Sequence, residues 1–204
     1  MNRPVSADSD GRRQRRDRNR DAVVQALLSL YNDGNLAPSV DEIAARSGVS
    51  ARSLFRYFDD VDDLCRAAIE QQQNAVRHLA VIDTDTTRPL AERAEMLARR
   101  RAELFETIES IATVSRLRAP FQLVVADGLT EGRAFLRSQL ATLFGPELRQ
   151  MPPALAAARL ATADVIASFE SWRLLRDDQR LTRSKAAAAV AEALTALLAP
   201  SDHT

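Results

Sequence analysis

The hydrophobic residues of this chain recur every three or four positions over most of its length, which is the spacing of one face of an α-helix. Between residues 17 and 31 this stripe includes Val24, Leu27 and Leu28, and the Asn-Asp-Gly-Asn sequence that follows is typical of a helix end. No segment alternates apolar and polar residues as a half-buried β-strand does. The pattern therefore predicts an all-α protein.

Two short helices joined by a tight turn are predicted after this first helix. Ser39 and Glu42 have the spacing of a capping box, so a helix should begin directly after Ser39. Gly48 can adopt the left-handed conformation that ends a helix, and Ser50 can cap a second helix over residues 51–58. The pair has the layout of a helix-turn-helix.

The second helix of this pair should have two chemically different faces. Leu54, Phe55 and Phe58 are three and four residues apart and are expected to face the core. Four polar residues should be exposed on the opposite side: Arg52, Ser53, Arg56 and Tyr57. Such a face is what a recognition helix presents to the DNA major groove, where arginine pairs with guanine edges and serine, tyrosine and arginine bind phosphates. The alternative is a helical hairpin whose polar face is only solvated.

The run DEIAARSGVSARSLFRYFDDVDDL resembles the DNA-binding signature of the tetracycline-repressor (TetR) family of bacterial transcription regulators. The positions that match the signature outright are Ile43, Ala44, Gly48, Val49, Ser50, Leu54, Phe58 and Leu64. Ser53, Phe55 and Tyr57 stand where the family has threonine, tyrosine and histidine. Val61, among four aspartates, stands where the family has a lysine that meets a DNA phosphate, so either this edge tilts away from DNA or other residues supply the affinity. The resemblance implies a three-helix DNA-binding domain, which we place at residues 17–60.

The segment 1–16 is expected to be a disordered basic arm. Six arginines lie between residues 12 and 20. Such a run is usually a solvated tail, but ahead of a helix-turn-helix it can follow the phosphate backbone or enter the minor groove. The residues expected to contact DNA are Ser39, Ser50, Arg52, Ser53, Arg56 and Tyr57, with Arg16 and Arg18 from the arginine run.

Residues 61–204 are expected to form a larger helical domain for effector binding and dimerisation. Its first helix, from residue 61 to about 81, follows the DNA-binding domain without a flexible break and should connect the two domains rigidly. Proline positions and helical spacing predict further helices at residues 89–106, 108–117, 120–144, 153–177 and 182–198.

Large apolar residues and arginines at helical spacing mark the middle helices of this domain. They could form an ordinary core or line a small-molecule pocket, and the family resemblance implies an effector pocket here. The candidate lining residues are Met96, Arg100, Leu104, Phe105, Leu117, Phe121, Val125 and Trp172.

The last two predicted helices are rich in alanine, which lets helices approach each other closely. The resemblance implies that these helices pair with their copies in a second subunit as a four-helix bundle, whereas an intrachain hairpin is the alternative. One helix-turn-helix covers only a half-site, which favours a homodimer. The candidate dimer residues are Ala163, Ile166, Phe169, Val190, Leu194 and Leu197.

The net charge and the few cysteine and histidine residues exclude several classes of protein and of binding site. The 28 basic and 28 acidic residues give a formal net charge of zero, which excludes a uniformly basic DNA-binding surface. Cys65 is the only cysteine, so no intrachain disulfide can form and a cytoplasmic location is expected. With His78 and His203 as the only histidines, we expect no zinc site and no cofactor. No run is apolar and long enough for a membrane span or a signal peptide.

The sequence is therefore interpreted as a homodimeric transcriptional repressor that binds a palindromic double-stranded DNA operator and responds to a small-molecule effector. Repression, as opposed to activation, follows only from the family resemblance. One alternative is a DNA-binding regulator of the same fold without a small-molecule effector, controlled by a protein partner. A remote alternative is an enzyme on a helical fold, but no nucleophile triad, phosphate-binding glycine loop or metal-ligand spacing supports it.

Overall fold

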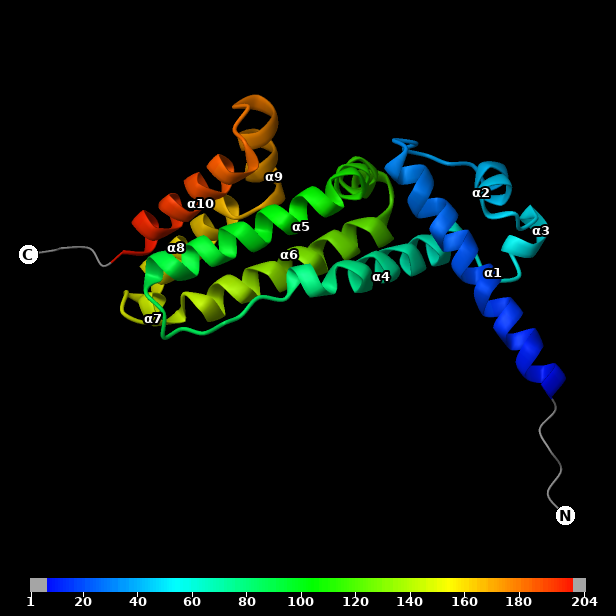
Figure 1. The fold of residues 1–204 in the computed structure, drawn as a ribbon, viewed down its shortest axis with the longest axis horizontal. Helices are drawn as coiled ribbons and strands as arrows, with labels where there is room; N and C mark the ends of the chain where they lie inside the picture. The colour runs from blue at the N-terminus through cyan, green and yellow to red at the C-terminus, as the bar shows by residue number, and fades with distance from the viewer. Residues whose placement is uncertain (1–6, 200–204) are drawn as a thin grey trace, which may run out of the picture. The chain divides into compact units, whose positions relative to one another are not determined.

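The computed structural model describes residues 7–199, with side chains from residue 11, and its regular structure over this range is entirely helical (Figure 1). The prediction of an all-α protein is thus confirmed. The helices are α1 (Ala7–Asn32), α2 (Val40–Ser47), α3 (Ala51–Leu54), α4 (Val61–Ala80), α5 (Leu90–Arg118), α6 (Leu123–Leu143), α7 (Gly145–Leu148), α8 (Pro153–Ile166), α9 (Phe169–Arg173) and α10 (Arg183–Leu198). A 3₁₀ turn at Ala119–Phe121 precedes α6, and a π-helical segment at Leu174–Asp178 follows α9.

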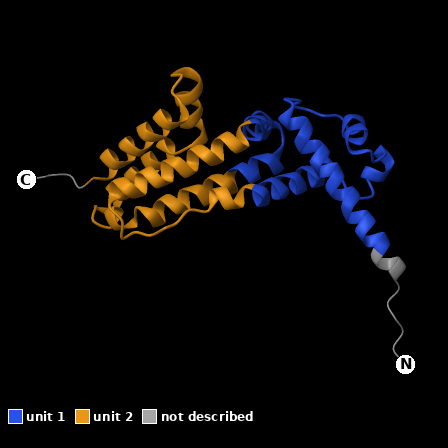
Figure 2. Ribbon diagram, viewed as in Figure 1, with its two compact units in different colours: residues 1–75, 110–129 blue, residues 76–109, 130–204 orange. Residues whose placement is uncertain are grey.

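The chain divides into two compact units (Figure 2). Unit 1 combines the described residues up to Ala75 with residues 110–129, and unit 2 combines residues 76–109 with the chain from Thr130 onward. Helices α4, α5 and α6 each contribute residues to both units. This division differs from a boundary at residue 60, because Leu64 of α4 and Val114 of α5 are buried in the core of unit 1.

The core of unit 1 forms where α1 crosses α2 and α3 and receives parts of α4 and α5. Helix α1 packs directly against α2. The apolar face of α1 and the segments packed against it contribute these buried side chains: Val23, Val24, Leu27, Leu28, Ile43, Val49, Leu54, Phe58 and Leu64. Arg46 holds the ends of α1 and α2 together, since its Nη1 donates to Ser29 Oγ at 2.6 Å and to Asp33 Oδ2 at 2.8 Å.

Helix α1 begins earlier than expected. Residues 7–16, predicted to belong to a disordered arm, are helical, and residues 11–18 are exposed. Arginine and glutamine are good helix formers, and a helix whose later turns are fixed by a buried stripe extends without a second nucleation cost. The first six residues of the expected arm lie outside the described residues.

Two helix boundaries in unit 2 also differ from expectation. The predicted break near residue 107 is absent, and α5 continues through Thr107, whose hydroxyl donates to the Glu103 carbonyl at 2.8 Å within the helix. In contrast, the single helix expected at 153–177 ends at Ile166. Ser168 starts α9 there by accepting a hydrogen bond from the Ser171 backbone at 3.1 Å.

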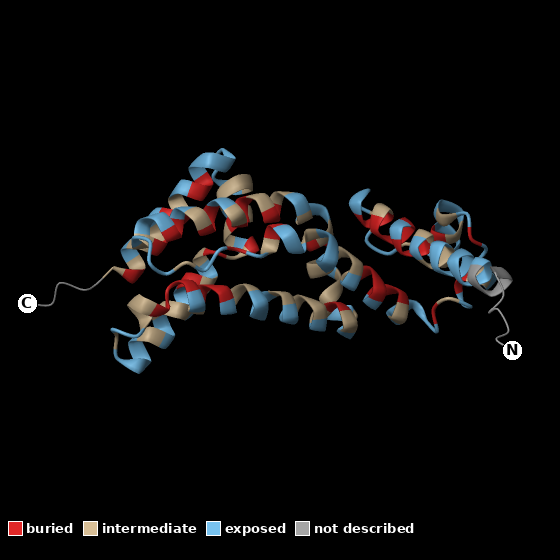
Figure 3. Cartoon of the chain, turned by 60° about the horizontal axis from the view of Figure 1, so that its bottom comes forward, coloured by how far each residue is buried: buried red, intermediate tan, exposed pale blue. Residues whose placement is uncertain are grey.

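The core of unit 2 is formed by α5, α6 and the helices that follow. Buried and exposed positions alternate around the long helices with the helical period (Figure 3). Phe105 of α5 meets Phe169 of α9 edge to face, with ring centroids 5.6 Å apart. The largest buried side chains of this core are Leu97, Phe105, Leu140, Leu143, Phe144, Leu194 and Leu198.

None of the helices described between residues 7 and 199 is both long enough and apolar enough to cross a lipid bilayer. Over the same range, no three His, Cys, Asp or Glu side chains come together in a way that could hold a metal ion.

Candidate nucleic-acid interface

Helix α2 has the predicted bounds and the predicted capping box. The Ser39 backbone N–H donates to Glu42 Oε2 at 2.7 Å, and the Glu42 N–H donates to Ser39 Oγ at 3.2 Å. These hydrogen bonds stabilise the carboxylate and lower the pKa of Glu42. Gly48 ends the helix with φ 69°, the left-handed conformation that the sequence predicted for it.

Helix α3 begins as predicted but is shorter. Ser50 caps it, since the Ser53 N–H donates to Ser50 Oγ at 3.3 Å. The α-helix ends at Leu54, and the backbone then tightens, with the Arg56 N–H on the Ser53 carbonyl at 3.1 Å and the Tyr57 N–H on the Leu54 carbonyl at 2.9 Å. The helix expected over residues 51–58 is therefore one α-turn, followed by two three-residue turns and a final four-residue bond from the Phe58 N–H to the Leu54 carbonyl at 3.1 Å.

This tightening changes which side chains face the core. Leu54 and Phe58 are buried as predicted, but Phe55 is 50% exposed, so its expected core position is wrong. In a three-residue turn, Tyr57 comes to lie over Leu54, while Phe55 rotates away from both. Tyr57 is accordingly half-buried against the core of unit 1, and its hydroxyl accepts a hydrogen bond from Asn19 Nδ2 at 3.0 Å.

The two arginines of the proposed recognition surface are free to bind a ligand. Arg52 and Arg56 are exposed, and neither makes an ion pair or side-chain hydrogen bond within the part of the chain that the structure describes. Ser53 lies between them, half-buried, with its hydroxyl 3.0 Å from Ser50 Oγ. The structure thus brings Ser50, Arg52, Ser53 and Arg56 together on one short segment.

Two predicted DNA-contact residues lie on the exposed extension of α1. Arg16 and Arg18 are both exposed, and Arg18 Nε donates to the Gln14 carbonyl at 3.3 Å. Arg20, two residues later, instead stacks on the Phe58 ring at 4.9 Å from its centroid. The arginine run therefore begins as a solvated helix and ends against the core.

The aspartates around Val61 have structural roles. Asp60 Oδ1 accepts the Asp63 N–H at 2.7 Å, and Asp63 Oδ2 accepts the Asp59 N–H at 3.3 Å, so these carboxylates cap the start of α4. Asp62 accepts from Gln122 Nε2 at 2.7 Å. The acidic cluster therefore stabilises a helix start, which accounts for it without a phosphate contact.

The residues expected to line an effector pocket are divided between the two units. Leu117, Phe121 and Val125 belong to unit 1, while the other five belong to unit 2. Phe121, at the end of the 3₁₀ turn that begins at Ala119, is 90% exposed, and Leu117 in the last turn of α5 is 52% exposed. Within unit 2, three of the candidates are buried core side chains: Leu104, Phe105 and Trp172. Arg100 is half-exposed, and it pairs with Glu103 at 3.1 Å and caps the His78 carbonyl at 2.7 Å.

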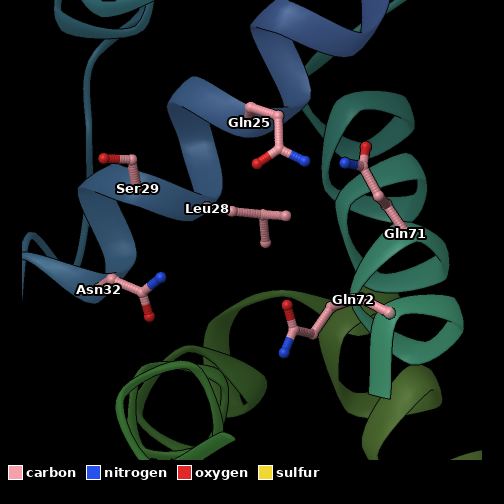
Figure 4. Close-up of a pocket in the computed structure, with 7 residues that line it drawn as sticks. Gln25, Leu28, Ser29, Asn32, Gln71 and Gln72 are labelled. Carbon is pink, nitrogen blue, oxygen red and sulfur yellow. The ribbon is translucent and has the colours of Figure 1, made fainter. Parts of the chain in front are cut away.

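A polar depression with a volume of about 250 Å³ lies within unit 1, between α1 and α4 (Figure 4). Amide side chains from both helices surround it, among them Gln25, Asn32, Gln71 and Gln72. None of the predicted pocket residues borders it.

The expected dimer residues are also partly misplaced. Four of them are buried inside the single chain and cannot face a second subunit: Ala163, Phe169, Val190 and Leu194. They lie on the sides of α8, α9 and α10 that face the core of unit 2. Ile166 and Leu197 are half-buried. Val165 at 65% exposed and Leu155 at 39% exposed mark the outer side of α8, which the sequence reasoning missed.

The sequence prediction names Arg100 as a pocket residue, but its neighbour Arg101 is the buried arginine, with 3% of its surface exposed. The burial of Arg101 could have been predicted from the helical period. Arg101 is four residues from both Leu97 and Phe105, and therefore shares their buried face of α5.

Comparisons with known proteins agree with this geometry. Residues 26–68, from the C-terminal end of α1 to the first turns of α4, match the model of the bacterial regulatory proteins of the tetR family. A comparison with curated proteins found no match.

Three solved structures share the fold. A tetR-family transcriptional regulator from Streptomyces coelicolor is similar with a TM-score of 0.67 and 20% identity, over 87% of this chain and 81% of that one. The multidrug binding protein EbrR, complexed with imidazole, has a TM-score of 0.63 and 21% identity, over 93% and 98%. A TetR transcription regulator from Haloarcula marismortui has a TM-score of 0.58 and 15% identity, over 88% and 96%.

The family match covers the capped α2, the glycine turn and α3, and the structural likeness extends over most of the chain. Members of this family regulate transcription and are not enzymes. Residues 26–68 therefore form a DNA-binding domain of the TetR family of transcriptional regulators, within a chain that shares the fold of solved members of that family.

Proposed function

We propose that this regulator is a homodimeric repressor that leaves a palindromic operator in the cytoplasm when a small molecule binds unit 2. The observation that carries the proposal is the pair of exposed arginines, Arg52 and Arg56, which have no ion-pair or side-chain hydrogen-bond partner in the described chain and follow the Gly48 turn. Placing two unpaired guanidinium groups on one short segment costs electrostatic free energy unless an anionic partner is bound.

In this proposal the arginines contact base edges or phosphates of the major groove. Ser39 and Ser50, both exposed at helix starts, lie where a helix N-terminus favours a phosphate. Ser53 supports the arginines, and Tyr57 reaches DNA only by exchanging its hydrogen bond with Asn19. Arg16 and Arg18 on the α1 extension add phosphate contacts that compensate for the absence of a lysine at position 61.

Dimerisation would use the outer sides of α8 and α10. Helix α8 exposes alanines together with Leu155 and Val165. Helix α10 exposes Ala188 and Ala196, which are eight residues apart and therefore lie on the same side of the helix. An exposed apolar face of this kind is rarely left solvated in a stable protein. Half-buried Ile166 and Leu197 would complete the contact, with the same patch on both subunits as a twofold axis requires.

An effector in unit 2 could alter the DNA-binding unit because α4, α5 and α6 run through both units. In unit 1, Arg118 of α5 donates to the Leu36 carbonyl at 2.6 Å, directly before the helix-turn-helix, and to Gln122 Oε1. EbrR, of the same fold, is described as a multidrug binding protein. The effector would weaken DNA binding only by as much as it prefers the DNA-incompetent conformation.

The test is selection of DNA from a random pool with the purified full-length protein, followed by binding measurements on the enriched sequence. The expected result is a palindrome whose half-sites are one helical turn or a multiple of it apart, bound by an even number of subunits. Failure to enrich any sequence would contradict the DNA-binding part of the proposal. A single half-site bound by one subunit would contradict the dimer.

A second candidate, control by a protein partner, would be favoured by exposed apolar Phe121 and Leu123 at the α5–α6 corner, which are 90% and 81% exposed. Thermal-shift screening with small molecules separates the two, because a bound effector raises the melting temperature by mass action.

A further inference from the structure

The guanidinium of Arg101 has buried hydrogen-bond donors that nothing in the described chain uses. Its Nη2 donates to the Leu136 carbonyl at 2.9 Å and to Gln139 Oε1 at 3.0 Å, both on α6. Its Nε and Nη1 are fully buried and have no partner among the described residues. Buried donors of a charged group are almost always satisfied, so an unused set indicates a missing acceptor.

The other buried polar side chains of the described residues show what a satisfied group looks like here. Arg93, also 3% exposed, donates to the carbonyls of Arg88 and Leu143 and pairs with Glu147. Gln139 donates from Nε2 to the Ala80 carbonyl at 2.6 Å. Arg101 is therefore an exception within its own core.

The positive charge of Arg101 is also incompletely compensated. Burial lowers the pKa of Arg101 to about 10, and attraction to Asp164 offsets part of that effect. Asp164 is itself paired with Arg137 Nη1 at 3.3 Å. Arg101 nevertheless stays protonated at neutral pH, so unit 2 keeps a buried cation that lacks a close counter-ion.

Apart from Gln139, the Leu136 carbonyl and Asp164, the neighbours of Arg101 along α5 and α6 include buried apolar side chains. Leu97 and Phe105 flank Arg101 on the same face of α5, and Leu140 follows Gln139 on α6; all three are buried. A partner for Arg101 must therefore combine anionic oxygens with apolar carbon. The charge of Arg101 is already partly compensated by attraction to Asp164. One further negative charge is therefore enough to neutralise it, which favours a carboxylate over a doubly charged phosphate.

We propose that Arg101 binds the carboxylate of an apolar organic acid, and that acids of this class are the effectors of the regulator. The inference rests on the proposed effector-responsive function and specifies its ligand. The carboxylate would accept hydrogen bonds from Nε or Nη1, and the hydrocarbon part would displace or join the apolar side chains around it.

The test uses the full-length protein and matched pairs of probes, each acid with its primary amide: octanoate, decanoate, benzoate and indole-3-acetate. Melting temperatures are measured with about 1 mM of each probe, and release of the selected operator is followed by fluorescence anisotropy. We expect at least one acid to raise the melting temperature by about 2 °C or more and to release DNA, while its amide does neither.

The variants R101M and R100M separate Arg101 from its neighbour. R101M should lose the response to the acid, while its ligand-free melting temperature should equal or exceed that of the wild type, because the unpaired buried charge is gone. R100M should keep the response, since Arg100 is half-exposed and paired. Should R101M not fold, R101K takes its place, with at least a tenfold weaker response to the acid expected.

No response to any acid, an equal response to acid and amide, an acid response that survives in R101M, or one that is undiminished in R101K would each overturn the assignment of Arg101. DNA release by the neutral amides alone would overturn it too, but would leave the effector-responsive repressor standing. Absence of DNA release by every compound would overturn both.

Discussion

The side-chain amide of Asn19 donates a hydrogen bond to the Tyr57 phenol over 3.0 Å and so joins α1 to the turn that follows α3. The bond is partly buried and connects residues 38 positions apart. It connects the turn next to Arg56 to α1, and it gives Tyr57 a structural role in the DNA-free protein.

Replacing Tyr57 with phenylalanine removes this bond and leaves the ring. We expect the variant to lose about 0.5–1.5 kcal/mol of unfolding free energy, which lowers the melting temperature by a few degrees, with only a modest loss of operator affinity. The opposite result, an unchanged melting temperature with a large loss of affinity, would show that the hydroxyl serves DNA and not Asn19.

Arg56→Ala should weaken operator binding by about 1–3 kcal/mol, because an exposed arginine that reads a base or holds a phosphate loses its whole interaction. The unfolding free energy should not change, since Arg56 has no ion-pair or side-chain hydrogen-bond partner in the described chain. Titration of labelled operator with wild type and variant measures the difference.

Arg77→Ala is the matched control for Arg56→Ala. Arg77 is an exposed arginine near the end of α4, in unit 2. Its removal changes the net charge equally and should leave affinity nearly unchanged. Equal losses from both variants would mean that net charge, and not a contact of Arg56, sets the affinity.

The double variant Arg16→Ala and Arg18→Ala tests the α1 extension. Alanine keeps the helix, so circular dichroism should not change. If each arginine neutralises one phosphate, the slope of log affinity against log salt should decrease by about 2. Arg77→Ala again serves as the charge control. An unchanged slope would show that Arg16 and Arg18 do not contact DNA phosphates and are only exposed to solvent.

The sequence predicted those parts of the interface that local interactions decide. Ser39 with Glu42, Gly48 and Ser50 act within a few residues of one another, and the observed caps and the left-handed turn follow from them. The exposure of Phe55 could not be predicted in this way. It depends on the tightening after Leu54 and on the contact of Tyr57 with Asn19, far away in the sequence.

The second unit was harder to predict because helical periodicity identifies a buried face without identifying what covers it. The sequence predicts a dimer contact for Phe169 and Leu194, but both are buried within the single chain. Phe121 was assigned to a pocket, but the 3₁₀ turn after Arg118 exposes it. Arg101 lies on the buried face of α5, and only the packing of α5 on α6 reveals that two of its donors lack acceptors among the described residues.

The capping box gives α2 a dependence on acid pH. Hydrogen bonds from Ser39 lower the pKa of Glu42 below its ordinary value of 4.5, so the ionised side chain stabilises the folded state. This contribution is complete above pH 4.5 and is lost as the pH falls through the lower folded-state pKa. On acidification, the melting temperature of the E42Q variant should therefore fall less than that of the wild type. E95Q, at an exposed position of α5, is the control and should behave as the wild type does.

Replacing either of two glycines with alanine should change the unfolding free energy, with opposite signs at the two positions. A Cβ at Gly48 or at Gly132 would meet no other atom within 4 Å, so neither substitution causes a clash. Gly48 has φ 69°, where an alanine is strained by about 1–2 kcal/mol, and Gly48→Ala should destabilise unit 1 accordingly. Gly132 lies inside α6, where alanine is favoured over glycine by about 0.5–1 kcal/mol, and Gly132→Ala should stabilise unit 2.

Urea unfolding curves of the two glycine variants measure both effects against the wild type. Gly48→Ala should also reduce operator affinity, because strain in the turn moves α3 relative to α2, while Gly132→Ala should leave DNA binding intact. Since both changes add the same methyl group to open space, only the backbone conformation distinguishes them. Equal shifts of the same sign would show that the left-handed turn does not determine the geometry of the helix-turn-helix.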